Sequence, residues 1–572
     1  MHDLVIRGGR IVDGTGEPAR SGDVAIDGDR ITSVGGRAGP ARRELDADGL
    51  VVGPGWVDIH THYDGQVTWD PHLTPSGWHG VTTVVMGNCG VGCAPAKPDR
   101  HQWLIGLMEG VEDIPGTALA EGIRWEWESF PEYLDAVERA PHALDVAAQV
   151  PHGAVRAYVM GERGAKNEEP TGDDVDRMAA IVGEGLAAGA LGFSTSRTLL
   201  HRAVDGEPVP GTFAGEQELL GIGRALGETG RGVWELASDL APEADEFAWM
   251  EKLSAATGRP VTFACLQNDL DPQQWRRLLA LSDEAAGRGA RIVPQVAARP
   301  TGLLMGLEST AHPFLNHPSY EAVAHLPLAE RVARLRDPEV RRRILSEKPE
   351  NVLPIAAFIF ASFHKLFPLG DPPDYEPPPE RSVAAEAARR GVSPAEIAYD
   401  WMLENDGKAL LYFPLLNYAD CDFEAIRTML MHPGAVLGLS DGGAHCGIIC
   451  DAGMPTFMLT HWVRDRSRGE RVPLEWAVRA QTRNTAELFD LRDRGVLAPG
   501  YKADVNLIDF DALALHAPEM VFDLPAQGRR LVQHAEGYRA TVCSGEVTWE
   551  NGEPTGALPG ALVRGPQPGP VA

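Results

Sequence analysis

The chain has few cysteines, no long apolar run and a shortage of basic residues. Its 572 residues include 7 cysteines and no CxxC pair, which is typical of a reducing compartment and not of a disulfide scaffold. No apolar stretch approaches the roughly 18 residues that a membrane-spanning helix requires. The first residues, MHDLVIRGGRIVDG, alternate apolar and polar side chains, unlike a signal peptide. We therefore expect a cytoplasmic protein with no membrane partner.

Acidic residues outnumber basic ones by 81 to 52, which gives a formal net charge of −29. Binding to phosphates requires a positive surface, so no nucleic-acid partner is expected. The same charge repels anionic small molecules at long range. The length exceeds the roughly 250–300 residues at which single cores stop growing, so the chain should contain more than one domain.

Both ends of the chain are expected to form short strands separated by glycine and Asp-Gly turns. Strands from the two termini can pair with each other, and we predict one discontinuous small β-sandwich domain built from residues 1–53 and 491–572. The segments are DLVIRGGRIVDG, DVAIDGDRITSVG, LVVGPGWVDIHTH, GVLAPGYKADVNLIDFDAL and YRATVCSGEVTWENGEP.

Residues 54–490 alternate strand-like apolar runs with longer helical stretches, such as residues 173–189 and 475–491. This pattern is typical of α/β proteins with a parallel sheet, and eight such units form a (β/α)8 TIM-type barrel of about 250 residues. The strand candidates are 81–88, 190–196, 232–238, 260–267, 291–297, 408–416 and 435–443.

The spacing between two of these candidates is too long for one helix, which predicts an insertion at about 300–385. Residues 367–382, FPLGDPPDYEPPPERS, are too rich in proline for a regular helix. The insertion is either an ordinary surface excursion or a lid over the barrel mouth.

The motif WVDIHTH places His60 and His62 two residues apart at the end of an apolar strand. Positions i and i+2 of a strand share a face, so both imidazoles should point into one cavity, which suits a metal ion. A pair of half-buried structural histidines would give the same motif. Asp441 ends another apolar run, AVLGLSDGG, and the first and last strands of a barrel are neighbours. Two imidazoles and one carboxylate leave a coordination position open for water.

Cys89 ends the run VVMGNCG and could bind zinc as a thiolate, although a buried inert thiol is the alternative. Together with PGWVDIHTH, WEWESFPEYLDAV, ALGFSTS, LGLSDG and APGYKADVNLIDFD, this segment resembles the metal-dependent amidohydrolase superfamily, and more closely its N-acyl-D-amino-acid deacylase (D-aminoacylase) group. The resemblance spans nearly the whole chain outside the insertion. It implies a barrel with a β-sandwich and the hydrolysis of an amide by metal-activated water.

The resemblance also assigns roles to individual residues. It implies that His60 and His62 form the first-strand metal pair, that Cys89 is a ligand, and that Asp441 is a ligand and the catalytic base and acid. Members of this group carry further histidine ligands on strands five and six, whereas the corresponding segments here, GVWELASDL and VTFACLQNDL, have none. Glu235 and Cys265 are the residues there that could replace them. We therefore expect one Zn²⁺ ion and leave a second site open.

The substrate-binding residues also depart from the group. The segment after Asp441 lacks the arginine that normally pairs with a substrate carboxylate, a role that suits guanidinium. The candidates for substrate binding are His445, His152 and Arg197, with Arg299 as a further replacement for the arginine.

The expected activity is hydrolysis of a linear amide in an N-acyl D-amino acid or a related N-acyl amine. Two alternatives stay open: a cyclic-amide or other C–N hydrolase, and a metal-poor barrel that acts as a binding protein. The expected partner of the hydrolase is its substrate, a small acylated amine. The sequence leaves open the acyl group, the chirality and whether the chain forms a homo-oligomer.

Overall fold

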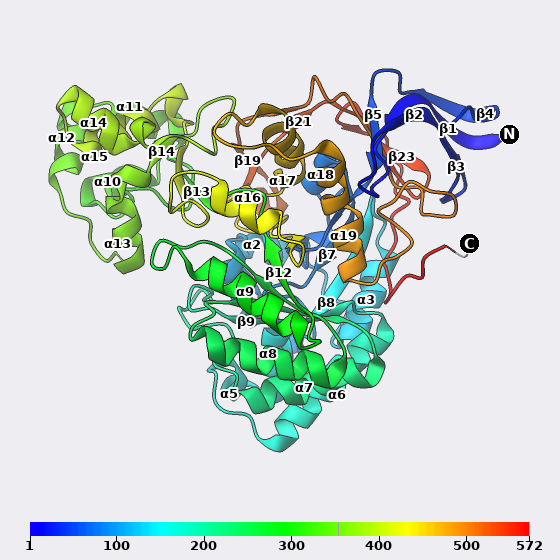
Figure 1. Cartoon of the computed structure of the whole chain (residues 1–572). Coiled ribbons are helices and arrows are strands. Elements are labelled where there is room, and N and C mark those ends of the chain that lie inside the picture. The colour runs from blue at the N-terminus through cyan, green and yellow to red at the C-terminus, as the bar shows by residue number, and fades with distance from the viewer. Residues whose placement is uncertain (353, 571–572) are drawn as a thin grey trace.

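A computed structural model describes residues 1–352 and 354–570 of the chain (Figure 1). Its central sheet has eight parallel strands in the order β16-β12-β11-β10-β9-β8-β7-β6. The sheet curls so that the segments after its two edge strands meet in a parallel bridge between Thr61 and Gly442. This α/β architecture is consistent with a TIM-type barrel. The strands are β6 (Trp56–Asp58), β7 (Val81–Met86), β8 (Asp145–Pro151), β9 (Gly192–Arg197), β10 (Val233–Ser238), β11 (Val261–Ala264), β12 (Ile292–Val296) and β16 (Val436–Leu437).

The strands of this sheet are buried on both faces because helices cover its outer side. Every residue of β7 and β8 is buried, as expected for a parallel sheet. The helix predicted over residues 173–189 is confirmed, and its start is fixed by a capping box between Thr171 and Asp174. Figure 1 shows four consecutive helices of this layer, in green shades, at the bottom of the molecule. They are α6 (Gly172–Ala188), α7 (Glu216–Thr229), α8 (Glu243–Thr257) and α9 (Gln274–Gly287).

Two predicted elements are corrected by the structure. Residues 408–416 do contain a strand, β15 (Leu411–Pro414), but it pairs antiparallel with β13 and β14 in a separate three-stranded sheet. The helix predicted over 475–491 is two helices, because Thr482 leaves the helical region with φ −127° and ψ −84°. The other two strands of the three-stranded sheet are β13 (Gly302–Met305) and β14 (Phe367–Pro368), and the two helices are α18 (Leu474–Gln481) and α19 (Arg483–Leu488).

A nine-stranded sheet combines strands from both ends of the chain. Its order is β24-β23-β22-β17-β5-β1-β2-β3, with β4 paired to β1. Its centre joins the two ends, because β17 pairs antiparallel with β5, and β5 leads directly into the first barrel strand. The strands are β1 (His2–Ile11), β2 (Arg20–Asp27), β3 (Arg30–Val34), β4 (Ala41–Asp46), β5 (Val51–Pro54), β17 (Val505–Ile508), β22 (Tyr538–Cys543), β23 (Glu546–Glu550) and β24 (Glu553–Pro554).

The predicted insertion forms a helical lobe that Figure 1 shows at the upper left. It has its own apolar core, which includes Leu335, Ile397 and Met402, and it continues past residue 385 to β15. Residues 367–382 contain no α-helix, as their proline content predicts. The helices are α10 (Pro318–Ala324), α11 (Leu328–Leu335), α12 (Pro338–Ser346), α13 (Pro354–Ala361), α14 (Val383–Arg390) and α15 (Pro394–Met402). In the described part of the chain, no helix is both long and apolar enough to cross a membrane.

A buried ion network ties the barrel to the C-terminal segment. Asp145, the first residue of β8, is 1% exposed and accepts hydrogen bonds from Arg494 (2.6 Å) and Lys502. Its other oxygen accepts the amide of Ala561 at 3.0 Å. Burial opposes ionisation, but the two cations outweigh it and hold the pKa of Asp145 below its usual range. The carboxylate therefore stays charged and compensates two buried cations.

We expect Asp145→Ala to lower the free energy of unfolding by about 3–5 kcal/mol, because it removes the anion that two buried cations share. Within the described chain, Arg494 then keeps only its pairing with Asp493, and Lys502 keeps only the more distant Asp504, 3.7 Å away. Urea denaturation at neutral pH measures the change. Asp135→Ala is the matched control: this exposed carboxylate lies 2.6 Å from Arg564, and its removal should cost less than about 1 kcal/mol. Equal losses in the two variants would contradict the role of Asp145.

Candidate metal centre

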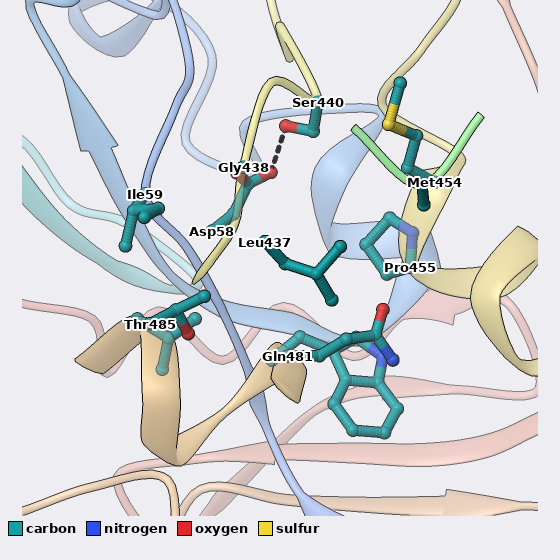
Figure 2. Close-up of a pocket in the computed structure, with 12 residues that line it drawn as sticks. Asp58, Ile59, Leu437, Gly438, Ser440, Met454, Pro455, Gln481 and Thr485 are labelled. Carbon is teal, nitrogen blue, oxygen red and sulfur yellow. Dashed lines mark hydrogen bonds between the residues drawn. The ribbon is translucent and has the colours of Figure 1, made fainter. Parts of the chain in front are cut away.

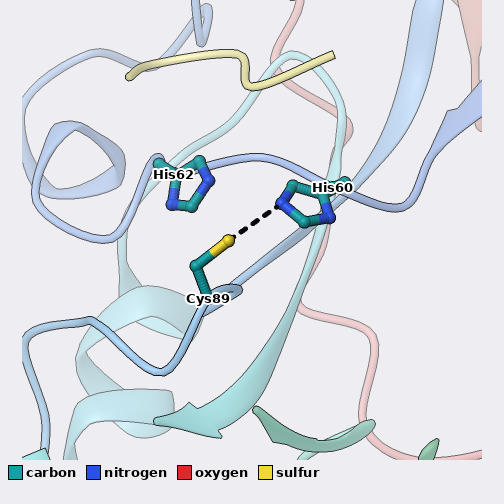
Figure 3. A group of neighbouring side chains, drawn as sticks. All are labelled: His60, His62 and Cys89. Atoms are coloured by element: carbon teal, nitrogen blue, oxygen red, sulfur yellow. Dashed lines mark hydrogen bonds between the residues drawn. The ribbon is translucent and has the colours of Figure 1, made fainter. Parts of the chain in front are cut away.

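Two histidines and a cysteine gather where β6 and β7 end. His60 and His62 follow β6, and Cys89 follows β7, so two adjacent strands supply all three side chains. All three are buried, and one ligand atom from each lies within 4.8 Å of the others. Figure 3 shows the sulfur of Cys89 next to both imidazole rings. A single metal ion can contact the whole group.

Both histidines direct the same ring nitrogen into the centre. His60 Nδ1 is hydrogen-bonded to Gln295 Oε1 at 3.1 Å, and His62 Nδ1 lies 3.2 Å from Glu112 Oε1. Their Nε2 atoms lie 3.5 and 3.7 Å from Asp441 Oδ1. The acceptor at His60 Nδ1 and the negative charge beside His62 Nδ1 both favour a proton on Nδ1, which leaves Nε2 as the free ligand atom. The arrangement therefore presents two imidazole nitrogens to one point.

The last barrel strand brings Asp441 to this point. The amide of Asp441 donates to the carbonyl oxygen of His60 at 3.1 Å. The neighbouring Ser440 hydroxyl bonds to the carboxylate of Asp58, as Figure 2 shows, and lies 3.1 Å from the same carbonyl oxygen. Burial raises the pKa of Asp58 to about 7, although the bond from Ser440 works against that rise. These contacts close the barrel and fix Asp441 beside the histidines.

The cavity in Figure 2 lies next to the Asp58–Ser440 pair. Its volume is about 40 Å³, and most of its lining is apolar, including Val57, Leu437 and Met454. Pockets for small organic ligands are several times larger, at about 300–1,000 Å³. This cavity is therefore part of the packing and does not hold the substrate.

Three residues of the centre have left-handed backbone conformations. The φ angles are 55° at Cys89, 50° at Asp441 and 53° at His445. Such angles are uncommon outside glycine and persist only when the surroundings impose them, often at functional sites. Here each one turns its side chain at the end of a strand or in the loop that follows.

Charge governs the protonation of the centre. Burial alone would raise the pKa of Asp441, but the contact with His62 and the other nearby imidazoles lower it far below its usual value. Burial lowers the pKa of His62, yet the negative charges of Glu112 and Asp441 outweigh it and raise that pKa to about 9. Burial also lowers the pKa of His60, to about 4. At neutral pH His62 is therefore protonated, whereas His60 is neutral.

Glu112 is a functional candidate that the sequence did not reveal. It is the last residue of α1 (His101–Glu112), is 1% exposed and lies beside His62. Neither of its carboxylate oxygens has a hydrogen-bond partner among the described residues. Its sequence signal is weak, because a glutamate near the end of an apolar helix usually faces water. Only the fold reveals that this one faces inward.

Glu235 and Cys265, which could replace the histidines missing from strands five and six, differ in their distance from the centre. Glu235, on β10, accepts the amide of Cys89 at 2.8 Å, and its Oε1 lies 4.0 Å from His60 Nδ1. Burial raises the pKa of Glu235 to about 8. Cys265, by contrast, directs its sulfur at Met429, 3.8 Å away. Of the two, the structure brings Glu235 to the centre.

The donor set fits a divalent cation such as zinc. Imidazole, thiolate and carboxylate are zinc ligands. Buried carboxylates cost several kcal/mol when their charge is not compensated, and unpartnered oxygens remain on Glu112 and Glu235 within the described chain. Burial raises the pKa of Cys89 well above its usual value, so a bound cation is needed to form the thiolate.

Of the substrate-binding candidates, the structure brings only His445 close to the candidate metal ligands. Its Nε2 lies 3.9 Å from Glu112 Oε2 and 4.0 Å from Asp441 Oδ2, and its side chain is 20% exposed. His152 is fully buried between Thr195 and Glu218, at 2.7 and 3.1 Å. It therefore belongs to a separate network.

The two candidate arginines are already paired. Arg197 makes three hydrogen bonds to Glu246, at 2.6 to 3.1 Å. Arg299 is fully buried, lies 3.0 Å from Asp451 and stacks over the ring of Tyr375 at 4.0 Å. Both guanidinium charges are thus compensated within the protein.

His201 is a second residue that the sequence analysis missed. It follows β9, and its Nδ1 lies 3.1 Å from the hydroxyl of Ser196. Burial, and then the positive charges of His445 and His62, lower the pKa of His201 to about 3, which places it near the centre as a neutral ring. Leu199 and Leu200, 50% and 63% exposed, precede it on the same loop.

Known proteins resemble this chain over most of its length. The model of a family described as the amidohydrolase family matches residues 43–549. The chain is 28% identical over 567 residues to a D-aminoacylase of Alcaligenes xylosoxydans xylosoxydans, covering 98% of this chain and 97% of that protein. It is also 28% identical to an N-acyl-D-glutamate deacylase of the same organism, over 93% of this chain and 92% of the relative.

Solved structures of the same two kinds of protein resemble this chain. A D-aminoacylase described as having a binuclear metal centre superposes with a TM-score of 0.66 at 25% identity, over 99% of this chain and 100% of the other. An N-acyl-D-glutamate deacylase from Bordetella bronchiseptica, in complex with zinc and a phosphonate inhibitor, shares the fold. Its TM-score is 0.62 at 24% identity, over 98% of this chain and 99% of the other.

We expect Glu112→Gln to weaken zinc binding by about tenfold, because the neutral amide removes the negative charge 3.2 Å from His62 Nδ1. Competition with a chromophoric chelator measures the affinity. Glu109→Gln, on the same helix, is the control, since Glu109 bonds to the amide of Gly116 at 3.0 Å and does not contact the histidines. Equal affinities in the Glu112 variant and the unmodified protein would contradict this role.

Proposed function

Because the chain belongs to the amidohydrolase family, we propose that it hydrolyses the linear amide bond of N-acyl-D-amino acids and related N-acyl amines. The protein is a metal-dependent amide hydrolase, as its full-length relatives are D-amino-acid deacylases. The observation that carries the proposal is the convergence of His60, His62, Cys89 and Asp441 at the carboxyl ends of the barrel strands. Catalytic residues of such barrels lie at this end.

We propose that one zinc ion is held by His60, His62 and Asp441, with Cys89 as a further ligand. Support comes from the Nε2 atoms that face Asp441 and from the sulfur of Cys89, which lies 3.3 Å from His60 Nε2. A bound zinc ion supplies a Lewis acid that polarises the amide carbonyl and lowers the pKa of water.

Asp441 is the proposed proton carrier of the reaction. Its low pKa keeps it ionised at neutral pH, so it can accept a proton from the attacking water. The proton then passes from its carboxyl group to the leaving nitrogen, which departs as a neutral amine. His445, partly exposed and 4.0 Å from Asp441, is positioned to donate to the substrate carbonyl. The proposal does not extend to His152 and Arg197, whose polar atoms are bonded elsewhere.

We also propose that the chain is divided as its sequence predicts. Residues 54–490 then form the hydrolase barrel with its inserted lobe, and residues 1–53 and 491–572 form one small β-sandwich domain. The pairing of β17 with β5 supports this division, since it joins the two ends of the chain. A cytoplasmic location remains part of the proposal.

Hydrolysis of cyclic amides has less support. Related enzymes that open cyclic amides carry a carboxylated lysine on the fourth strand. The fourth strand here, β9, reads GFSTSR and offers no lysine.

Asp441→Asn should retain the fold and lower kcat by about 10³, because the amide cannot carry the proton. Amine release from an N-acetyl-D-amino acid amide measures turnover, and metal analysis shows whether zinc is retained. Asp451→Asn, on the same loop but paired with Arg299, is the control. Turnover in the Asp441 variant near that of the unmodified protein would remove Asp441 from the mechanism.

The charge of the centre predicts a preference for substrates without a free carboxylate. Glu112, Glu235 and Asp441 form ion pairs only with histidines among the described residues. At low ionic strength we expect kcat/KM for an N-acetyl-D-amino acid amide to exceed that for the free acid by at least about fivefold, with the gap closing as salt rises. A preference for the free acid would show that a cation binds the carboxylate.

A further inference from the structure

Glu235 occupies a distinctive place in the barrel. It lies on β10, the fifth strand of the central sheet in chain order, and is completely buried. One carboxylate oxygen accepts the amide of Cys89 at 2.8 Å. The other, Oε1, lies 4.0 Å from His60 Nδ1 and has no hydrogen-bond partner among the described residues. An acid group is thus held against the backbone of one proposed ligand and close to another.

The ionised form of Glu235 costs free energy at this position unless a cation is present. A carboxylate removed from water loses its hydration, and a single backbone hydrogen bond does not replace it. The side chains of Glu112 and Asp441 add two further negative groups to the same centre, and no arginine or lysine of the described chain pairs with Glu235. Buried acids of this kind are retained in proteins where they pair with a charge or coordinate a metal.

We propose that Glu235 is a metal ligand, and that it holds a divalent cation on the Cys89 side of the centre through its unpartnered oxygen. This inference rests on the proposed function, because it assumes that the centre binds metal at all. With this role, Glu235 supplies a carboxylate on the fifth strand, where members of the D-aminoacylase group carry a histidine. A carboxylate is a harder donor than imidazole and adds one negative charge. Metal affinity on this side should then depend on the charge of Glu235 as well as on Cys89.

The alternative role for Glu235 is structural, as an acceptor for the amide of Cys89. Glu235→Gln separates the two roles, because glutamine keeps an acceptor oxygen of the same shape but loses the charge and most of the affinity for a metal. Glu235→His offers an imidazole in place of the carboxylate. Cys265→Ser is the matched control: Cys265 is equally buried directly after the next barrel strand, β11, but faces Met429.

The experiment measures cobalt and zinc binding to the purified metal-free full chain and these three variants. Chelator competition gives the affinity and metal analysis the stoichiometry, while the cobalt–thiolate charge-transfer band reports on Cys89. We expect Glu235→Gln to weaken binding by tenfold or more and to change this band, and Glu235→His to bind more tightly than Glu235→Gln. The control should match the unmodified protein, and circular dichroism verifies folding of each variant.

The outcomes distinguish a failure of the proposed function from a failure of the ligand role of Glu235. If the unmodified protein binds neither metal, the proposed function itself fails. If it binds metal and Glu235→Gln binds with the same affinity, stoichiometry and cobalt spectrum, the ligand role is wrong and Glu235 only supports Cys89. If Glu235→Gln does not fold, a cobalt spectrum of Glu235→His identical to that of the unmodified protein overturns the inference, because exchanging a coordinated oxygen for nitrogen must shift the band.

Discussion

The concentration of buried acid groups around two imidazoles is the constraint on which the rest of the structure depends. Glu112, Glu235 and Asp441 surround His60 and His62 with no arginine or lysine paired to them in the described chain. Glu112 and Glu235 are buried and Asp441 is 14% exposed. Ionised carboxylates that are shielded from water repel one another and cost several kcal/mol each unless a positive charge compensates them. A divalent cation would compensate most of this negative charge. The same charge balance accounts for the raised pKa of His62 and for the expected disfavour toward anionic substrates.

The fold meets this constraint by joining distant segments. The bridge between Thr61 and Gly442 closes the curled sheet, and the bond from the Asp441 amide to the carbonyl oxygen of His60 brings these two proposed ligands together. The nine-stranded sheet holds the start of the first barrel strand through β5 and β17. The ion network of Asp145 anchors the C-terminal segment to the barrel. Stability and ligand geometry therefore share the same contacts.

The sequence predicted the strands of the centre better than its surroundings. The His60-Thr61-His62 motif after β6 and the apolar run before Asp441 predicted the position of these side chains after barrel strands, because strand periodicity is local. Residue 112 was missed because its inward direction depends on how α1 packs against the barrel. The strand at 411–414 was assigned to the wrong sheet, since an apolar run does not encode its partner strand. The two candidate arginines could not be judged from sequence, because their partners Glu246 and Asp451 lie 49 and 152 residues away.

Anomalous X-ray diffraction at the zinc absorption edge, from crystals grown with zinc, tests the central claim most directly. The account predicts a strong peak within about 2.0–2.3 Å of His60 Nε2, His62 Nε2 and an oxygen of Asp441, with the sulfur of Cys89 at a similar distance from a zinc ion. No peak among these residues, or a peak held only by residues elsewhere in the chain, would contradict it.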